Sequence, residues 1–169
     1  MNGPTAAIKR PNGPLVWLDM DQKELDDAYD QLVYAPNRDQ LTKRRIANSA
    51  AARTRIGEPL RFAYGPTPIE GLDLYRSASA SRGKEGSERA PVAIFVHGGA
   101  WRSGSASEFT FLAEPFVHAG AHFAVLDFTN VSDTGGSLFP MAEQVRRAIG
   151  WLFRNAEQFG GDRNRLYLI

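Results

Sequence analysis

A short apolar run that ends in a histidine and two glycines carries the chemistry of this sequence. Residues Ala93 to Val96 are apolar, which predicts a buried strand, and the segment His97-Gly98-Gly99-Ala100-Trp101 follows as a tight, exposed turn. Glycine accepts positive φ angles and lets a substrate atom come close to the backbone. The N–H groups of such a turn are therefore free to face a ligand.

Two other interpretations of this glycine turn exist. Two glycines after a strand can do no more than bend the chain toward a helix, or they can cradle a phosphate in a nucleotide-binding α/β protein. A phosphate loop is expected to show Gly-x-Gly-x-x-Gly or a Lys-Ser/Thr pair, and the run from Gly98 to Gly104 has neither. The phosphate interpretation is therefore disfavoured, whereas a plain structural bend stays open.

The segment from Ala93 to Trp101 resembles the oxyanion-hole loop of α/β-hydrolase-fold serine hydrolases of the hormone-sensitive-lipase and arylformamidase-like kind. The run from Phe159 to Ile169 is similar to the approach to the nucleophile strand in the same families. The loop from Asp127 to Val131 differs from the Tyr-Arg-Leu-Ala-Pro-like sequence motif of the lipase branch. This difference favours the arylformamidase-like branch. The resemblance covers residues 59–169, and residues 15–56 only loosely.

This resemblance implies roles for the residues at the turn. It implies that the backbone N–H groups of Gly98, Gly99 and Ala100 form an oxyanion hole. Each donor in such a hole stabilises the transition state by on the order of 3 kcal/mol. It also implies that Trp101 and Asn130 contact the substrate.

By the same resemblance His97 is a structural residue at the site. Its ring is expected to hydrogen-bond nearby backbone and so to fix the loop, because the histidine base of the family lies far downstream of the nucleophile. A role for His97 in proton transfer is not expected.

The catalytic side chains themselves are expected outside this sequence. In the family the nucleophile occupies a Gly-x-Ser-x-Gly elbow and is followed by the acid and the histidine base, and residues 1–169 hold no such elbow. The serine, the acid and the base are thus expected beyond Ile169, and this chain alone is expected to be inactive.

The implied function is hydrolysis of a carboxylic ester, or of an aryl formamide or other amide, through an acyl-enzyme. This mechanism needs no metal and no organic cofactor. The alternative is a non-catalytic member of the fold that binds a small ligand or a partner protein. The residue at the nucleophile position distinguishes the two functions: a serine indicates the hydrolase, and another residue indicates the binding protein.

The remaining histidines and the absence of cysteine limit other chemistry. His118 and His122 have the i, i+4 spacing of a helical metal site, but Gly120 lies between them and His122 opens an apolar strand, so no metal site is expected. The sequence has no cysteine, which excludes a disulfide and a cysteine nucleophile within it.

Charge and hydropathy restrict the partners and the location. The 20 Lys and Arg residues balance 19 Asp and Glu residues, which gives no electrostatic reason to expect nucleic acid or an anionic membrane. No run approaches the ~18 apolar residues of a membrane-spanning helix, and the start at Met1 does not look like a secretory leader. We expect a cytoplasmic protein with a small-molecule substrate, and homo-oligomerisation stays open.

Hydrophobic periodicity and turn residues predict the elements that position the glycine turn. The expected helices cover residues 22–34, 37–56 and 140–159. A further helix is expected to begin at a capping box formed by Ser105 and Glu108. The expected strands cover residues 60–64 and 71–76 as an antiparallel pair, and residues 91–96, 122–128 and 165–169 as buried strands.

This order of elements predicts an α/β fold in which helices flank a mainly parallel sheet. The resemblance makes it an α/β-hydrolase fold, with residues 1–58 as an N-terminal arm and helix pair that could cap the site and residues 59–169 as the N-terminal half of the core. The core would end at the strand before the nucleophile elbow. Because that strand would be a bare apolar edge, we expect a C-terminal continuation or a second chain to complete the sheet.

Overall fold

The computed structural model describes residues 13–78 and 89–169. Packing divides the chain into two compact units, of which the first ends at Leu41 and the second runs from Thr42 to Ile169. The expected division after residue 58 stays a prediction. No helix within the described ranges has both the length and the apolar content needed to cross a membrane.

The first unit contains a small hairpin followed by two short helices. Strands β1 (Leu15–Trp17) and β2 (Met20–Asp21) pair antiparallel, and helix α1 (Gln22–Tyr29) follows directly. The Oδ1 atom of Asp21 accepts a hydrogen bond from the Glu24 N–H at 2.9 Å, and Glu24 Oε2 accepts one from the Asp21 N–H at 3.1 Å. This capping box confirms the predicted helix start.

The prediction of one continuous helix over residues 22–34 is wrong. The chain leaves the helical conformation at Asp30, where ψ is 97°, and restarts as helix α2 (Gln31–Tyr34). The Oδ1 atom of Asp30 accepts a hydrogen bond from the Leu32 N–H at 2.9 Å. Such local side-chain bonds compete with the helical backbone ladder, which explains the break.

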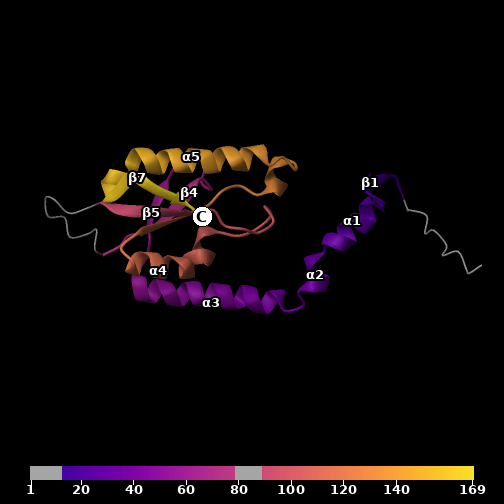
Figure 1. Cartoon of the computed structure of the whole chain (residues 1–169), viewed down its shortest axis with the longest axis horizontal. Helices are drawn as coiled ribbons and strands as arrows, with labels where there is room; N and C mark the ends of the chain where they lie inside the picture. Colours follow the sequence, from indigo (N-terminus) through magenta and orange to yellow (C-terminus); the bar gives the residue numbers. More distant parts are fainter. Residues whose placement is uncertain (1–12, 79–88) are drawn as a thin grey trace, which may run out of the picture. The chain divides into compact units, whose positions relative to one another are not determined.

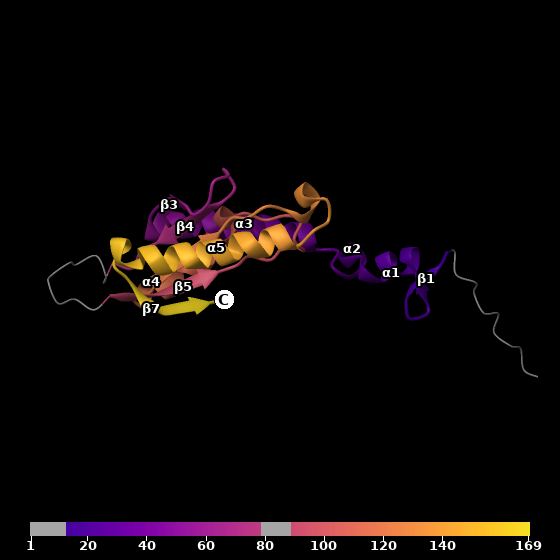
Figure 2. The same ribbon diagram turned by 90° about the horizontal axis from the view of Figure 1, so that it is seen from above.

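The second unit is built on a five-stranded sheet with the order β3-β4-β6-β5-β7 (Figures 1 and 2). The β4 strand is antiparallel to both of its neighbours, whereas β5 is parallel to β6 and to β7. The strands are β3 (Leu60–Ala63), β4 (Gly71–Tyr75), β5 (Ala90–Phe95), β6 (His122–Leu126) and β7 (Gly161–Leu168). The expected antiparallel pair and the parallel strands are confirmed.

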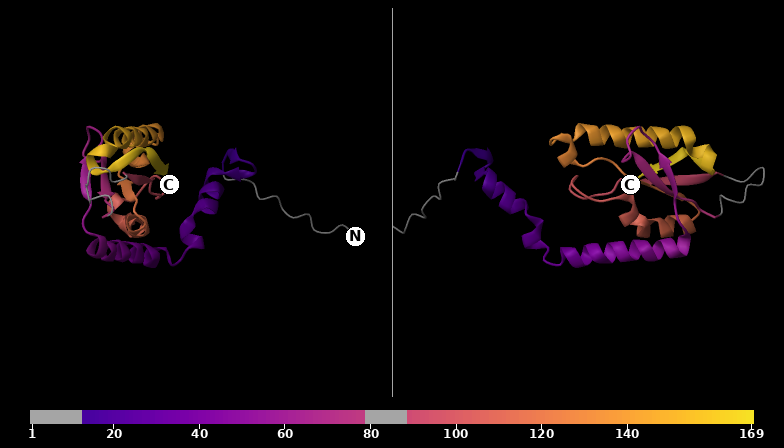
Figure 3. Two further views of the ribbon diagram at one scale, coloured as in Figure 1. Left: turned by 60° about the vertical axis from the view of Figure 1, so that its left-hand side comes forward. Right: turned by 180° about the vertical axis from the view of Figure 1, so that it is seen from behind.

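Helices cover both faces of this sheet. Figures 1 and 3 show α5 (Phe139–Asn155) along one face and α4 (Ala113–His118) on the other, with α3 (Arg38–Ile56) outside α4. Three short 3-10 segments connect these elements: η1 (Ala106–Leu112) before α4, η2 (Val131–Thr134) after β6, and η3 (Ala156–Phe159) after α5.

The face under α5 holds the larger core cluster. An apolar stripe of this helix faces the sheet, because Met141, Ala148 and Leu152 are fully buried and the partly buried Val145 packs against them. The stripe continues into η3 through Ala156. Apolar side chains at spacings of three and four thus anchor α5 to β5 and β6.

The opposite face is packed by aromatic rings. Phe109 of η1 lies 5.4 Å from Phe95, and Phe116 of α4 stacks on Phe123 at 5.0 Å between centroids. The η1 segment itself is a 3-10 helix whose N-terminal residue Ser105 makes no side-chain cap, so the predicted capping box is wrong.

Polar side chains of α3 contact η1. Glu108 pairs with Arg45 of α3 at 2.5 Å and also accepts a hydrogen bond from Ser105 Oγ at 3.4 Å, and its backbone oxygen accepts one from Ser49 Oγ at 2.6 Å. Arg53 adds a bond to the Ser107 oxygen at 2.5 Å. Polar side chains of α3 therefore hold η1 against the sheet.

The last strand begins four residues earlier than residue 165, the expected start. Gly161 pairs with Ala90 of β5, and the register shifts between Ala90 and Val92. A Cβ atom on Gly161 would lie 2.9 Å from the Val92 side chain and 2.8 Å from the Phe159 ring. Close packing of η3 on the sheet brings this glycine into the strand.

A buried histidine makes the stability of this fold depend on pH. His122 is 0% exposed at the start of β6, and its Nδ1 atom accepts a hydrogen bond from the Ser77 N–H at 3.0 Å. Burial lowers the pKa of His122 below 6.5. As the pH falls, the unfolded chain therefore binds the proton before the folded chain does. The contribution of the neutral ring to the stability of the folded state is lost as the pH falls through 6.5.

We predict that the free energy of unfolding decreases between pH 7 and pH 5 and that His122→Gln flattens this decrease. Urea denaturation at several pH values measures the effect. The control His118→Gln removes an exposed histidine from the end of α4 and keeps the pH dependence of the parent. An unchanged slope in His122→Gln contradicts the assignment.

Candidate functional site

The glycine turn follows the carboxyl end of β5 in a reversed conformation. The φ angles of Gly99, Ala100 and Trp101 are 141°, 53° and 61°, and the Arg102 N–H donates to the Gly99 oxygen at 3.0 Å. Two consecutive positive φ angles inside a hydrogen-bonded turn are typical of the mirror-image turn types. Non-glycine residues in this region are strained by about 1–3 kcal/mol each and cluster at functional sites.

Only one of the two adjacent glycines is required by packing. A Cβ atom on Gly99 would lie 1.9 Å from the backbone oxygen of Ser103, whereas one on Gly98 meets nothing within 4 Å. A Cβ atom on Gly104, where the loop returns, would lie 2.8 Å from His97 Nδ1. The fold therefore dictates Gly99 and Gly104, and space in front of Gly98 stays open.

The residues that carry the N–H groups of the turn are exposed. Within the described residues no group accepts a hydrogen bond from the N–H groups of Gly98, Gly99 or Ala100, and all three residues are exposed. Exposed amides beside an apolar surface are suited to bind a developing negative charge. Their role as an oxyanion hole stays a prediction.

The His97 ring is held inside the loop. It is 5% exposed and stacks between Phe109, at 5.3 Å, and Phe128, at 4.5 Å, with interplanar angles of 11° and 13°. Its Nδ1 atom lies 2.9 Å from the Gly98 oxygen. Because a carbonyl only accepts, Nδ1 carries the proton and donates, which fixes the peptide that precedes Gly99.

Trp101 and the loop after β6 lie side by side. The Val131 N–H donates to the Trp101 oxygen at 2.7 Å, and the indole is tilted against Phe128 at 6.1 Å. Asn130, half-buried, immediately precedes Val131. The structure thus brings both sequence-predicted substrate residues to the same end of the sheet.

An apolar pocket of about 310 Å³ adjoins the turn. Its lining consists of Val96 and Trp101 from the two sides of the glycines and Leu138, Ala142 and Val145 from the start of α5. Asn130 lies outside this lining. Sequence reasoning did not assign α5 to this pocket, although the apolar residues around the start of the helix were a usable signal.

A carboxylate that the sequence analysis did not single out anchors the end of the loop. Asp127 directly follows β6, and its Oδ1 atom accepts a hydrogen bond from the Ala106 N–H at 2.6 Å. Its Oδ2 atom pairs with Arg61 of β3 at 2.7 Å, and Arg61 also binds Asp73 at 2.9 Å. A carboxylate at the end of a buried strand was the available sequence signal.

The neighbours of Asp127 are polar and hold the loop. The Tyr64 hydroxyl donates to the Asp127 backbone oxygen at 2.5 Å, and burial raises the pKa of Tyr64 to about 12, so Tyr64 keeps its proton near neutral pH. Burial also raises the pKa of Asp73, against the lowering effect of Arg61, with which Asp73 pairs.

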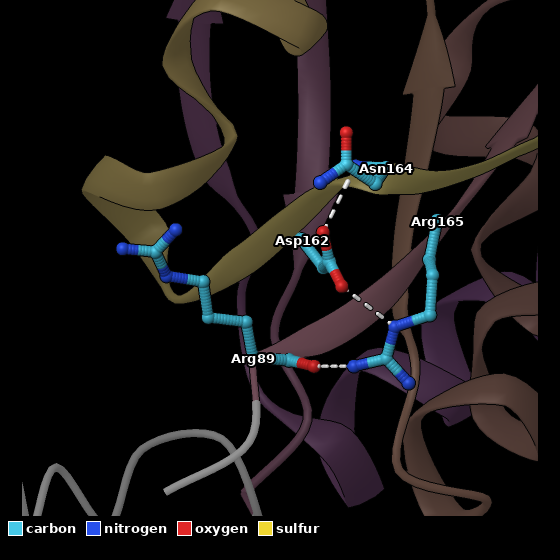
Figure 4. A pocket seen from close by; sticks show the side chains of 4 residues that line it. All are labelled: Arg89, Asp162, Asn164 and Arg165. Carbon is cyan, nitrogen blue, oxygen red and sulfur yellow. Dashed lines mark hydrogen bonds and ion pairs between the residues drawn. The ribbon is translucent and has the colours of Figure 1, made fainter. Parts of the chain in front are cut away.

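A second pocket, of about 500 Å³, lies at the amino ends of β5 and β7 (Figure 4). Its charged groups are paired within the protein: Asp162 accepts a hydrogen bond from the Asn164 N–H at 2.9 Å and pairs with Arg165 at 2.8 Å, and Arg89 pairs with Glu157 at 2.6 Å. Arg165 also donates to the backbone oxygen of Arg89. Ligands of open α/β sheets bind at the carboxyl ends instead, so this cluster holds a turn.

No metal ligand set forms around the histidines. His118 ends α4 and His122 lies buried in β6 with Nδ1 bonded to Ser77. Across residues 13–78 and 89–169 no group of three or more His, Asp or Glu side chains is arranged to hold a metal ion.

Solved structures share the fold of this chain over part of its length. An esterase from the Planctomycetes species Thermogutta terrifontis superposes with a TM-score of 0.57 at 21% identity, over 67% of this chain and 40% of that one. A structure from Silicibacter sp. TM1040 gives a TM-score of 0.64 at 21% identity, over 86% and 50% of the two chains. The chain has an α/β-hydrolase fold.

The family follows from the sequence comparison. The BD-FAE family model matches residues 72–169, more than half of the chain, and the chain belongs to this family. The matched range contains β4 to β7, the glycine turn and Asp127, whereas Arg61 lies before it.

Curated relatives carry two kinds of name. An isoprenylcysteine alpha-carbonyl methylesterase of Arabidopsis thaliana is 32% identical over 108 residues, which are 64% of this chain and 23% of that protein. A kynurenine formamidase of Danio rerio is 27% identical over 139 residues, 79% of this chain and 45% of that protein. The chain thus spans less than half the length of these relatives.

The turn geometry makes a prediction about the two glycines. Gly99→Ala is expected to lower the free energy of unfolding by about 2 kcal/mol or more, because its Cβ would overlap a backbone oxygen at a positive φ. Gly98→Ala, with open space at its Cβ, is the matched control and costs less than 1 kcal/mol. Urea denaturation measures both, and equal losses contradict the reversed turn.

The anchor at Asp127 makes another prediction. Asp127→Asn keeps an acceptor for Ala106 but removes the charge that faces Arg61, and we expect a loss of about 1–3 kcal/mol in unfolding free energy. Asp133→Asn, in exposed η2, changes stability by less than about 0.5 kcal/mol. Chemical denaturation measures the free energy of unfolding of both variants. Equal values for the two variants would show that Asp127 does not anchor the loop.

Proposed function

We propose that this chain supplies the oxyanion hole and part of the substrate pocket of a serine hydrolase that acts on carboxylic esters, or on aryl formamides and other amides, through an acyl-enzyme. The observation that carries the proposal is that Gly98, Gly99 and Ala100 are adjacent exposed residues whose N–H groups have no acceptor among the described residues, beside an apolar pocket. The names of the relatives, a methylesterase and a formamidase, support the same reaction class.

The contribution of the turn to catalysis is electrostatic. As the nucleophile attacks, the carbonyl oxygen gains negative charge, and amides already pointed at it stabilise the tetrahedral intermediate by about 3 kcal/mol per donor. The donors need no reorganisation, because the bond from Arg102 to Gly99, the His97 ring and the Asp127 anchor hold the loop beforehand. This preorganisation raises the rate rather than the substrate affinity.

The nucleophile, the acid and the base of this proposal lie outside residues 1–169. The β7 strand forms one edge of the sheet, and its end is apolar and exposed at Tyr167, Leu168 and Ile169. An apolar edge of this kind favours pairing with a further strand. We propose that a C-terminal continuation or a second chain provides that strand and the catalytic residues, and that this chain alone is inactive.

The remaining parts of the proposal follow from the mechanism. Acyl transfer by a serine, a histidine and backbone donors needs no metal and no organic cofactor. The partner is a small ester or amide, and neither nucleic acid nor a membrane is required. A cytoplasmic location also belongs to the proposal.

A fluorophosphonate probe tests the proposed reaction. The polypeptide that carries this chain in cells is labelled, digested and mapped by mass spectrometry, and we expect the modified serine to lie outside residues 1–169. The 169-residue chain on its own serves as the control and stays unlabelled. Labelling within residues 1–169 contradicts the assignment, and a folded polypeptide without any labelling supports a ligand-binding role instead.

A further inference from the structure

The loop that follows β6 contacts the glycine turn at two points. The Phe128 ring stacks on the His97 ring with 4.5 Å between centroids. Three residues further along the loop, the Val131 N–H donates to the Trp101 oxygen at 2.7 Å. The backbone of this loop therefore helps to set the position of both ends of the turn.

A side chain of α5 holds the loop between these two points. The Oε1 atom of Gln144 accepts a hydrogen bond from the Thr129 N–H at 2.8 Å, and both residues are half-buried. Because a backbone N–H only donates, the oxygen of the Gln144 amide is the atom that faces it. Thr129 lies between Phe128 and Val131 in the sequence, so this bond fixes the stretch of backbone that joins the two contacts.

The helix that carries Gln144 is itself anchored in the core. Met141 and Ala148, three residues before and four residues after Gln144, are fully buried. Residues at these spacings lie on one side of a helix, so packing against the sheet holds the part of α5 from which the Gln144 side chain extends. Functional groups are held most precisely when packed elements and hydrogen bonds support them from behind.

We propose that Gln144 is a positioning residue for the glycine turn: its amide oxygen keeps the loop from Phe128 to Val131 in the arrangement that supports His97 and Trp101. The catalytic consequence of this role rests on the proposed function. Donors that are held in place beforehand act on the transition state, so their misplacement lowers kcat and leaves substrate affinity nearly unchanged.

Hydrogen exchange of backbone amides in the full polypeptide tests the positioning role without turnover. Gln144→Met keeps the length of the side chain but removes the acceptor. We expect the Val131 N–H to exchange at least tenfold faster in this variant, because the loop that presents it to Trp101 is no longer held. Exchange of the buried Ala124 N–H, in the central strand β6, is expected to change less than threefold. Gln144→Glu keeps an oxygen acceptor and is expected to restore slow exchange at Val131.

Ester hydrolysis by the same variants measures the consequence for the proposed reaction. With p-nitrophenyl acetate as substrate, we expect Gln144→Met to lower kcat at least fivefold, with KM within twofold of the parent, and Gln144→Glu to recover most of the parent kcat. Gln158→Met is the matched control. It removes an exposed glutamine from η3, which follows the other end of α5, and leaves kcat and Val131 exchange unchanged.

The outcome is separable from that of the proposed reaction. If Val131 exchange responds as described and the fluorophosphonate does not label, Gln144 positions the turn and the hydrolase proposal falls. If labelling succeeds and Gln144→Met changes neither Val131 exchange nor kcat, the hydrolase proposal stands and this inference is wrong. Faster exchange that Ala124 shares equally, or that Gln144→Glu does not reverse, also overturns the inference, because it reflects a general loss of stability.

Discussion

The hydrogen bond from the Arg102 N–H to the Gly99 oxygen closes the turn on which the site depends. Within this turn Ala100 and Trp101 lie in the left-handed region, and a Cβ atom on Gly99 would overlap the backbone oxygen of Ser103. This conformation keeps the amides of Gly98 to Ala100 exposed and places the indole at the pocket. One turn thus determines both the donors and the wall beside them.

A strained turn persists only if its surroundings hold it, and three kinds of contact do so here. The His97 ring is stacked between two phenylalanines and bonded to the Gly98 oxygen. The Asp127 carboxylate accepts a hydrogen bond from the Ala106 N–H at the start of η1. Polar side chains of α3 bind η1 from its other side. The free energy that offsets the strain therefore comes from the core and from α3, at a distance from any substrate.

Local patterns allowed much of this to be predicted from the sequence, because periodicity and turn chemistry act between near neighbours. The strand before His97, the helix predicted over residues 140–159 and the helix start at residue 22 are of this kind. Contacts across many residues could not be predicted that way. The pairing of Glu108 with Arg45 is one of them, and the link between Asp127 and Arg61 depends on strand order, which no local pattern encodes.

The availability of the turn amides for negative charge is the central claim, and an NMR titration tests it most directly. The ¹⁵N-labelled chain is titrated with acetate, a small oxyanion, against chloride at equal ionic strength. The account predicts saturable downfield shifts of the amide protons of Gly98, Gly99 and Ala100 with acetate alone, and their loss in the Gly99→Ala variant. Amides that are protected from solvent exchange and do not respond to acetate would contradict it.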